Sequence, residues 1–302
     1  MTDWSWTPPA DSGIRVRMQA VNGVALELAE LDAANGSTDR LALCLHGFPE
    51  LNFSWRYQMP VLSAAGWRVW APNMRGYGAS DKPLGVNAYR LDTLIADVAA
   101  LIDASGARDV MLVAHDWGAI VAWHFAIRRL RPLTRLVIMN VPHPMVARRE
   151  GRRWRQIRRS WYVFLFQLPW VPEFGLAQAH ARRIGEAFTG MAVDKSRFPP
   201  EVTDIYRAAA SRRGALTAMV NYYRALLRTP DYGAIGDGRI DTPTLMIWGL
   251  EDTALGPWCA DGTEEWVPGI EVHRLPGVSH WVQQEAPERV NATMADWLAR
   301  PV

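Results

Sequence analysis

The sequence predicts an α/β fold in which a mostly parallel central sheet is interrupted by a helical insertion. Apolar runs of strand length alternate with helical patterns before residue 141 and again after residue 243. This alternation is typical of parallel strands joined by crossover helices. An apolar run also passes directly into a helix at Asp116. Such a sharp strand-to-helix junction can hold a nucleophile at the carboxyl end of a sheet.

The first two strands are expected to form a hairpin. Ile14–Val21 and Val24–Leu31 flank Asn22-Gly23, a pair of residues that favours a tight turn. Leu41–Leu45 is a continuous apolar run, as expected for a strand buried on both faces. Further strands are expected at Trp67–Pro72, Val110–Ala114, Leu136–Met139, Thr244–Trp248 and Glu271–Leu275, with helices at Leu91–Ala104 and Ala119–Leu130.

Between Pro142 and Thr229 the sequence shows helical patterns but no strand. We therefore expect residues 1–141 and 230–302 to form a core domain, and residues 142–229 to form a helical cap. Arg148–Arg159 holds seven arginines, for which we expect a solvated helix face; contact with an anionic surface is the alternative. Trp161–Val171 is aromatic and apolar, and we expect it to line the cleft between cap and core, with membrane contact as the alternative.

Composition narrows the class of protein. The 302 residues carry 33 basic and 31 acidic side chains, which does not indicate a general nucleic-acid surface. Two distant cysteines do not form a disulfide framework or a zinc motif. The first residues lack a signal-peptide pattern, and no run approaches the roughly 20 apolar residues that a membrane span needs. We expect a cytoplasmic protein without a membrane span, either a monomer or a homodimer.

Asp116 lies in the pattern of a nucleophile elbow. Ala114 and Gly118 stand two residues before and after it, and small residues are needed there because the turn is tight. The following helix directs its positive end at the carboxylate, which favours an ionised side chain. A carboxylate nucleophile displaces a leaving group at saturated carbon and forms an alkyl ester, so the leaving group is an epoxide oxygen or a halide. A simple N-cap role for Asp116 is the alternative.

An acid and a histidine follow in the order of α/β-hydrolases. Asp252 comes just after the strand Thr244–Trp248, and His280 comes after Glu271–Leu275. We expect His280 to activate water and Asp252 to orient it. Glu251 is the rival acid. Asn140 stands where some related enzymes place the acid, but it cannot carry a charge.

The loop after the buried strand is a candidate oxyanion hole. His46, Gly47, Phe48 and Pro49 follow Leu45 directly. The backbone amides of Phe48 and Trp117 are the expected donors to the oxyanion that forms when hydroxide attacks the ester. The alternative is a turn without a catalytic role. His115 precedes the nucleophile, so its side chain is expected to point away from it.

These motifs resemble the epoxide hydrolases of the α/β-hydrolase superfamily. The matching segments are HGFPE at 46–50, RGYGASDKP at 75–83, HDWG at 115–118, GLED at 249–252 and SHW at 279–281. The resemblance implies an α/β-hydrolase fold and conversion of epoxides to vicinal diols. It also implies a small hydrophobic epoxide as substrate and no metal or organic cofactor. The elbow begins with Ala114 where glycine is commoner, a small change that we expect to have little effect.

The same resemblance assigns two tyrosines of the cap to the epoxide oxygen. Tyr162 and Tyr223 stand in the matching segments, and Tyr222 is the neighbour with which Tyr223 could be confused. Epoxide opening needs such donors, because an alkoxide is a poor leaving group.

Two other functions stay open at this point. Haloalkane dehalogenases share the aspartate nucleophile; one group of them has Asn where this chain has Phe48, and another uses a cap tryptophan, for which Trp154, Trp161 and Trp170 are available. The second alternative is a non-catalytic ligand-binding protein on the same fold.

Overall fold

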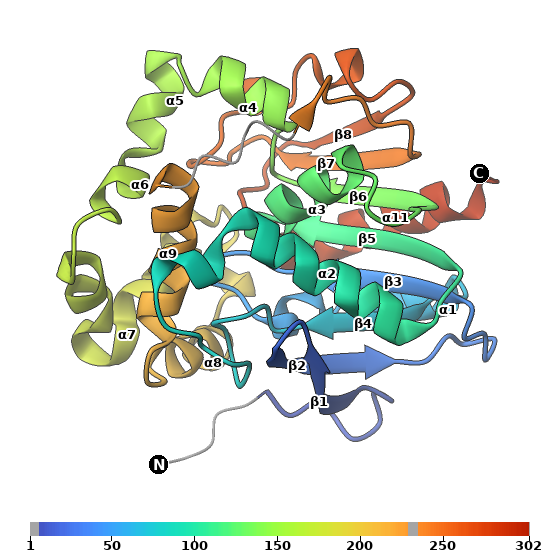
Figure 1. The fold of residues 1–302 in the computed structure, drawn as a ribbon, viewed down its shortest axis with the longest axis horizontal. Helices are drawn as coiled ribbons and strands as arrows, with labels where there is room; N and C mark the ends of the chain where they lie inside the picture. The colour runs from blue at the N-terminus through green and yellow to red at the C-terminus, as the bar shows by residue number, and fades with distance from the viewer. Residues whose placement is uncertain (1–5, 229–234, 302) are drawn as a thin grey trace.

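The computed structural model describes residues 6–228 and 235–301. Its centre is an eight-stranded sheet with the strand order β1-β2-β4-β3-β5-β6-β7-β8 (Figure 1). Strands β1 and β2 pair antiparallel, as do β2 and β4, and the remaining neighbours are parallel. The strands are β1 Arg15–Val21, β2 Val24–Leu31, β3 Arg40–Leu45, β4 Arg68–Pro72, β5 Asp109–His115, β6 Arg135–Met139, β7 Thr244–Gly249 and β8 Glu271–Leu275. Every strand predicted from the sequence is present.

Helices cover both faces of the sheet and bury a separate core on each. Because side chains alternate along a strand, Leu112 of β5 enters one apolar cluster while Met111 and Val113 enter the other. The first cluster includes α2 (Leu91–Ser105) and α3 (Trp117–Ile127), and the second includes α1 (Gln58–Ala64) and α11 (Pro287–Ala299). This double burial explains the continuous apolar runs of the central strands.

All described residues between β6 and β7 are helical or irregular, as the sequence predicts. The helices of this segment lie at one side of the sheet in Figure 1. They are α4 Pro144–Glu150, α5 Trp154–Arg159, α6 Trp161–Leu165, α7 Val171–Met191, α8 Pro200–Ala210 and α9 Ala215–Arg228; the short α10, Val282–Glu285, follows β8. The expected end of the cap, between residues 229 and 230, lies outside the described residues. Nowhere in the described part of the chain does a helix combine the length and apolarity that crossing a membrane requires.

Helix α7 consists of two helical stretches joined by an irregular link. Residues Ala179, His180 and Ala181 have φ angles of 51°, 54° and 55°, in the left-handed region that side chains disfavour. The guanidinium of Arg207 donates to the carbonyl oxygens of Ala179 and His180, each at 3.2 Å. Arg207 of α8 therefore helps to hold the link.

Candidate active site

The register of the parallel strands brings the predicted site residues to one edge of the sheet. Leu45 at the end of β3 pairs with Ala114 of β5, and His115 at the end of β5 pairs with Met139 of β6. Gly249, which ends β7, pairs with Leu275 of β8. The residues that follow these strands therefore leave the sheet side by side, at the carboxyl edge where ligands bind in open α/β sheets.

Asp116 occupies a sharp turn between β5 and α3. Its backbone has φ 46° and ψ −120°, a conformation that is rare for a residue with a side chain. A Cβ at Gly118 would come within 2.1 Å of the Leu45 carbonyl oxygen, and one at Gly47 would come within 2.2 Å of Cβ of Asp116. Both positions are thus sterically reserved for glycine. The Asp116 side chain makes no capping hydrogen bond to α3, which argues against a simple N-cap role.

The two carboxylate oxygens of Asp116 have different neighbours. Oδ1 accepts a hydrogen bond of 2.7 Å from the amide of Phe48, a predicted oxyanion-hole donor. Oδ2 lies 3.6 Å from Nε2 of His280. Burial alone would raise the pKa of Asp116, but His280, His115 and the Phe48 amide together hold it below its ordinary value. The side chain is therefore ionised, as a nucleophile must be.

His280 bridges the two predicted carboxylates. Its Nδ1 lies 2.6 Å from Oδ2 of Asp252. Burial alone would lower the pKa of His280, but Asp252 and Asp116 outweigh it and raise the pKa to about 10. With both carboxylates ionised, the imidazole is positively charged at neutral pH.

Asp252, and not Glu251, contacts the histidine. Its Oδ1 accepts hydrogen bonds from the amides of Ala254 and Leu255, at 2.7 and 2.8 Å. Burial would raise the pKa of Asp252, but His280, the Leu255 amide and the side chain of Asn140 lower it. Glu251 instead accepts from the amide of Val278 at 3.1 Å.

Asn140 has a part in the site that the sequence did not reveal. Its Nδ2 donates to Oδ2 of Asp252 at 2.7 Å, and its Oδ1 accepts from the Gly249 amide at 2.9 Å. Asn140 thus ties the end of β7 to the carboxylate that follows it. Its position after β6 was noticed in the sequence, but only as a place where an acid was missing.

The two predicted cap tyrosines lie together near Asp116. The rings of Tyr162 in α6 and Tyr223 in α9 are 5.9 Å apart between centroids. Burial, and next the negative charge of Asp116, raise the pKa of each hydroxyl above its ordinary value. Both hydroxyls are therefore protonated and can donate hydrogen bonds. Tyr222 points elsewhere, since its hydroxyl donates to the Arg75 carbonyl oxygen at 2.8 Å.

The loop after β3 is fixed by His46. Its Nε2 accepts a hydrogen bond of 3.0 Å from the Met74 amide, so Nδ1 carries the proton and donates to the Gly47 carbonyl oxygen at 2.9 Å. Burial lowers the pKa of His46 to about 4, which keeps the ring neutral. The peptide bond between Phe48 and Pro49 is cis. The hydrogen bonds of His46 therefore hold the loop that presents the Phe48 amide to Asp116.

Sequence reasoning missed a buried network behind this loop, centred on Glu50. One Glu50 oxygen lies 2.6 Å from Nδ1 of His115 and accepts from the Gly47 amide at 3.0 Å. The other accepts from the side-chain amides of Gln283 and Gln284, at 2.7 and 2.8 Å. Burial would raise the pKa of Glu50, but His115 and the Gly47 amide hold it below its ordinary value. The available signal was that Glu50 ends the matching segment HGFPE, but the sequence did not show what its side chain contacts.

His115 extends this network to His280. Its side chain points away from the nucleophile, as expected, and its Nε2 donates to the backbone oxygen of His280 at 2.9 Å. The Glu50–His115 pair thus links the oxyanion loop to the loop that carries His280.

Two expectations for the cap need correction. Trp161–Val171 does not line the cleft as a whole: Phe166 is buried beside Tyr223, but Trp161, Phe164 and Trp170 are exposed. This segment consists of the short helix α6 and the turn that leads to α7, and the apolar pattern did not distinguish side chains that face the core from those that face outward. Arg148–Arg159 is not solvated throughout either, because Arg159 donates to the Asp252 carbonyl oxygen at 2.6 Å.

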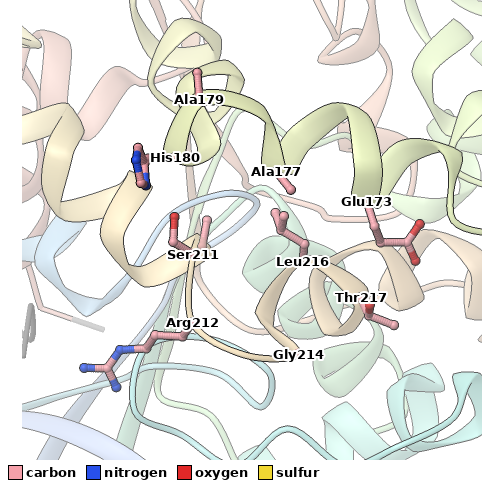
Figure 2. A pocket seen from close by; sticks show the side chains of 10 residues that line it. Glu173, Ala177, Ala179, His180, Ser211, Arg212, Gly214, Leu216 and Thr217 are labelled. Carbon is pink, nitrogen blue, oxygen red and sulfur yellow. The ribbon is translucent and has the colours of Figure 1, made fainter. Parts of the chain in front are cut away.

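A separate pocket lies in the cap, away from these residues. Figure 2 shows it between α7 and the turn that joins α8 to α9. Its volume is about 590 Å³, and Glu173, His180, Ser211 and Leu216 are among its lining residues. None of the predicted catalytic residues lines it.

The fold and the site together define an α/β-hydrolase that carries an aspartate, Asp116, at its strand-to-helix turn. Residues 43–287 match the sequence model of the alpha/beta hydrolase fold family. AB hydrolase superfamily protein YfhM of Bacillus subtilis is 36% identical over 95% of this chain and 98% of its own length. Epoxide hydrolase 3 of Mus musculus is 36% identical over 93% of this chain and 76% of its own length.

Solved structures agree with the sequence relatives. The epoxide hydrolase of Bacillus megaterium, crystallised with an inhibitor, superposes with a TM-score of 0.83 at 29% identity, over 94% of this chain and 100% of that one. Epoxide hydrolase A of Mycobacterium thermoresistibile superposes with a TM-score of 0.82 at 32% identity, over 94% of this chain and 98% of that one. The chain belongs to the epoxide hydrolase family of the α/β-hydrolase fold, which confirms the family and the fold predicted from its motifs.

Proposed function

We propose that this protein adds water to epoxides and forms vicinal diols through an alkyl ester on Asp116. The observation that carries the proposal is the position of His280, which lies 3.6 Å from the nucleophile and 2.6 Å from Asp252. A histidine so placed can activate the water that releases an ester on Asp116, whereas a simple structural ion pair needs only one carboxylate.

In the first step Oδ2 of Asp116 attacks a carbon of the epoxide ring. The carbon–oxygen bond of the ring breaks, and its electron pair goes to the departing oxygen. Tyr162 and Tyr223 hold that oxygen and supply a proton, because their raised pKa values keep both hydroxyls protonated. The product is an ester between Asp116 and the opened substrate.

In the second step His280 acts as the base. Esterification removes the negative charge of Asp116, which is one of the charges that raise the pKa of His280. The pKa of His280 then falls. The proton that the ring releases restores the tyrosine hydroxyl, and the neutral ring can take a proton from water. The hydroxide attacks the Asp116 carbonyl carbon, and the bond to the substrate oxygen breaks with its electron pair on that oxygen. This oxygen takes the proton of the carboxyl group formed on Asp116, the diol leaves, and Asp116 is again ionised beside protonated His280.

The backbone amides of Phe48 and Trp117 are proposed to hold the oxyanion of this second step. The Phe48 amide already donates to Oδ1 of Asp116, the oxygen that becomes the ester carbonyl. His46, Gly47 and Pro49 support this loop. No reorganisation of the donor is needed when the charge develops, which is the property that makes such sites effective.

The surroundings favour a small hydrophobic epoxide. The ring of Tyr223 packs edge-on against Phe48, Trp117 and Phe166, with centroids 5.4, 5.0 and 4.9 Å apart. We propose that residues 142–229 form a cap that holds such a substrate against the core. We also place the protein in the cytoplasm, where the free thiols of Cys44 and Cys259 are stable.

A direct assay separates this function from its rivals. The purified protein is incubated with styrene oxide and, separately, with bromobutane; the diol is measured by chromatography and bromide with a halide electrode. We expect diol without bromide. Release of bromide without diol would make the protein a dehalogenase. Binding of styrene oxide without either product would make it a non-catalytic ligand-binding protein.

A further inference from the structure

The segment of the cap that contains α5, α6 and the start of α7 exposes large apolar side chains. Trp154, Trp170 and Phe174 are 71, 81 and 72% exposed. Trp161, Phe164 and Val171 are also exposed. Half of the exposed large apolar side chains among the described residues lie between residues 154 and 174. We use the term apolar face for Trp154, Trp161, Phe164, Trp170, Val171 and Phe174. Exposed apolar side chains gathered in this way are typical of an interaction surface.

The same part of the chain is strongly basic. Residues 148–174 contain seven arginines but only two acidic residues, Glu150 and Glu173. Neither acid offers a free negative charge: Glu150 is buried among arginines, 2.9 Å from Arg155, and Glu173 pairs with Arg224 at 2.5 Å. The net positive charge of this segment is therefore available to a partner.

Three of these arginines carry most of that available charge. Arg148, Arg152 and Arg158 are exposed. Within the described parts of the chain, no acidic side chain forms an ion pair with any of the three. Helices α4, α5, α6 and the beginning of α7 follow one edge of the molecule in Figure 1, so the basic and apolar residues share that edge.

We propose that this edge docks the protein on the surface of an anionic lipid bilayer. Arginine pairs with lipid phosphate, and tryptophan places its apolar ring and its N–H group at the level of the headgroups. A basic segment with exposed tryptophan and phenylalanine is the pattern of a protein that lies on a membrane. Another protein would have to supply both an acidic surface and an apolar one, whereas an anionic bilayer supplies both.

Vesicle binding tests this directly. The full chain is sedimented with vesicles of phosphatidylcholine alone and with an equimolar mixture of phosphatidylcholine and phosphatidylglycerol. We expect sedimentation with the mixed vesicles, little with phosphatidylcholine alone, and loss of binding at high salt, because salt screens exposed charges. Arg152→Glu combined with Arg158→Glu is expected to weaken binding by at least about tenfold. Trp170→Ser combined with Phe174→Ser is expected to weaken vesicle binding but to leave the salt dependence of binding unchanged.

Matched controls lie elsewhere on the surface. Arg108→Glu reverses an exposed arginine, and Leu84→Ser removes a side chain that is 96% exposed, and neither should change vesicle binding. Absence of the wild-type protein from mixed-vesicle pellets at low salt would overturn the proposal. So would concentration-dependent dimers in analytical ultracentrifugation that the Trp170/Phe174 variant abolishes, because the edge would then be an interface between two copies. Vesicle binding is measured without substrate turnover, so its outcome does not depend on whether the protein hydrolyses epoxides.

Discussion

Nε2 of His280 lies 3.6 Å from Oδ2 of Asp116, close enough for the charge of the carboxylate to set the protonation of the ring. With both Asp116 and Asp252 ionised, the pKa of His280 is about 10. The ring is therefore protonated in the resting protein and cannot act as a base there. In the proposed mechanism, loss of the Asp116 charge on esterification frees the ring for the second step.

This relationship predicts how the second step depends on pH. In a single turnover, the rate constant for hydrolysis of the ester should rise with pH and level off, because the neutral ring is the active form. The apparent pKa should be lower than the value of about 10 that His280 has beside ionised Asp116. Stopped-flow tryptophan fluorescence measures this rate constant. A rate that falls as pH rises would contradict the role of His280 as base.

The two adjacent tyrosines of α9 should differ sharply. Tyr223→Phe is expected to lower kcat/KM by roughly 10- to 100-fold, since Tyr162 remains as the only donor to the leaving oxygen. Tyr222→Phe is the matched control: it removes the hydrogen bond to the Arg75 carbonyl oxygen, which should cost about 1 kcal/mol of stability and leave kcat/KM nearly unchanged. Equal losses of activity in both variants would remove Tyr223 from the mechanism.

Glu50→Gln should damage both the fold and the second step. The substituted amide cannot accept from all four groups that Glu50 contacts, namely Gly47, His115, Gln283 and Gln284. We expect a loss of about 3 kcal/mol in the free energy of unfolding, measured with urea. We also expect about tenfold slower ester hydrolysis, because His115 contacts the backbone of His280.

The control for Glu50 is Glu150→Gln. Glu150 is also buried and paired, but with arginines of the cap. This variant should lose stability without slowing ester hydrolysis in the folded protein. If both variants slow hydrolysis equally, the Glu50–His115 pair does not position the active site.

The irregular link in α7 predicts opposite effects of glycine at nearby alanines. Ala179→Gly should raise the free energy of unfolding by about 1 kcal/mol, because glycine adopts φ 51° without the clash of a Cβ. Ala177 lies in the preceding helical stretch, and Ala177→Gly should lower the same quantity by about 0.5–1 kcal/mol. Urea unfolding of both variants measures the difference. Destabilisation by Ala179→Gly would show that the link is not strained.

Local patterns in the sequence were sufficient to predict much of the site. The elbow around Asp116 could be predicted because a tight turn requires small residues at fixed offsets. Asp252 and His280 could be placed because the carboxyl ends of parallel strands meet at one edge of the sheet. Tyr162 and Tyr223 were assigned through resemblance to the family, and no periodicity would have chosen Tyr223 over Tyr222.

What could not be predicted depends on contacts between distant residues. Glu50 meets Gln283 and Gln284 across more than 230 positions of the chain, and neither glutamine belongs to a motif. Asn140 looked like a missing acid, yet it donates to the acid that replaces it. The exposure of Trp161 in α6 and of Trp170 in the turn before α7 depends on which side chains of the segment meet the core, and an apolar run does not show this.

Mass spectrometry of the His280→Gln variant after incubation with styrene oxide tests the central claim most directly. The substitution should leave attack by Asp116 intact and prevent hydrolysis of the ester. We predict that the protein gains the mass of one epoxide, and that peptide mapping places the gain on the peptide containing Asp116. An unmodified protein that still forms diol would show that water adds to the epoxide directly, and would contradict an ester on Asp116.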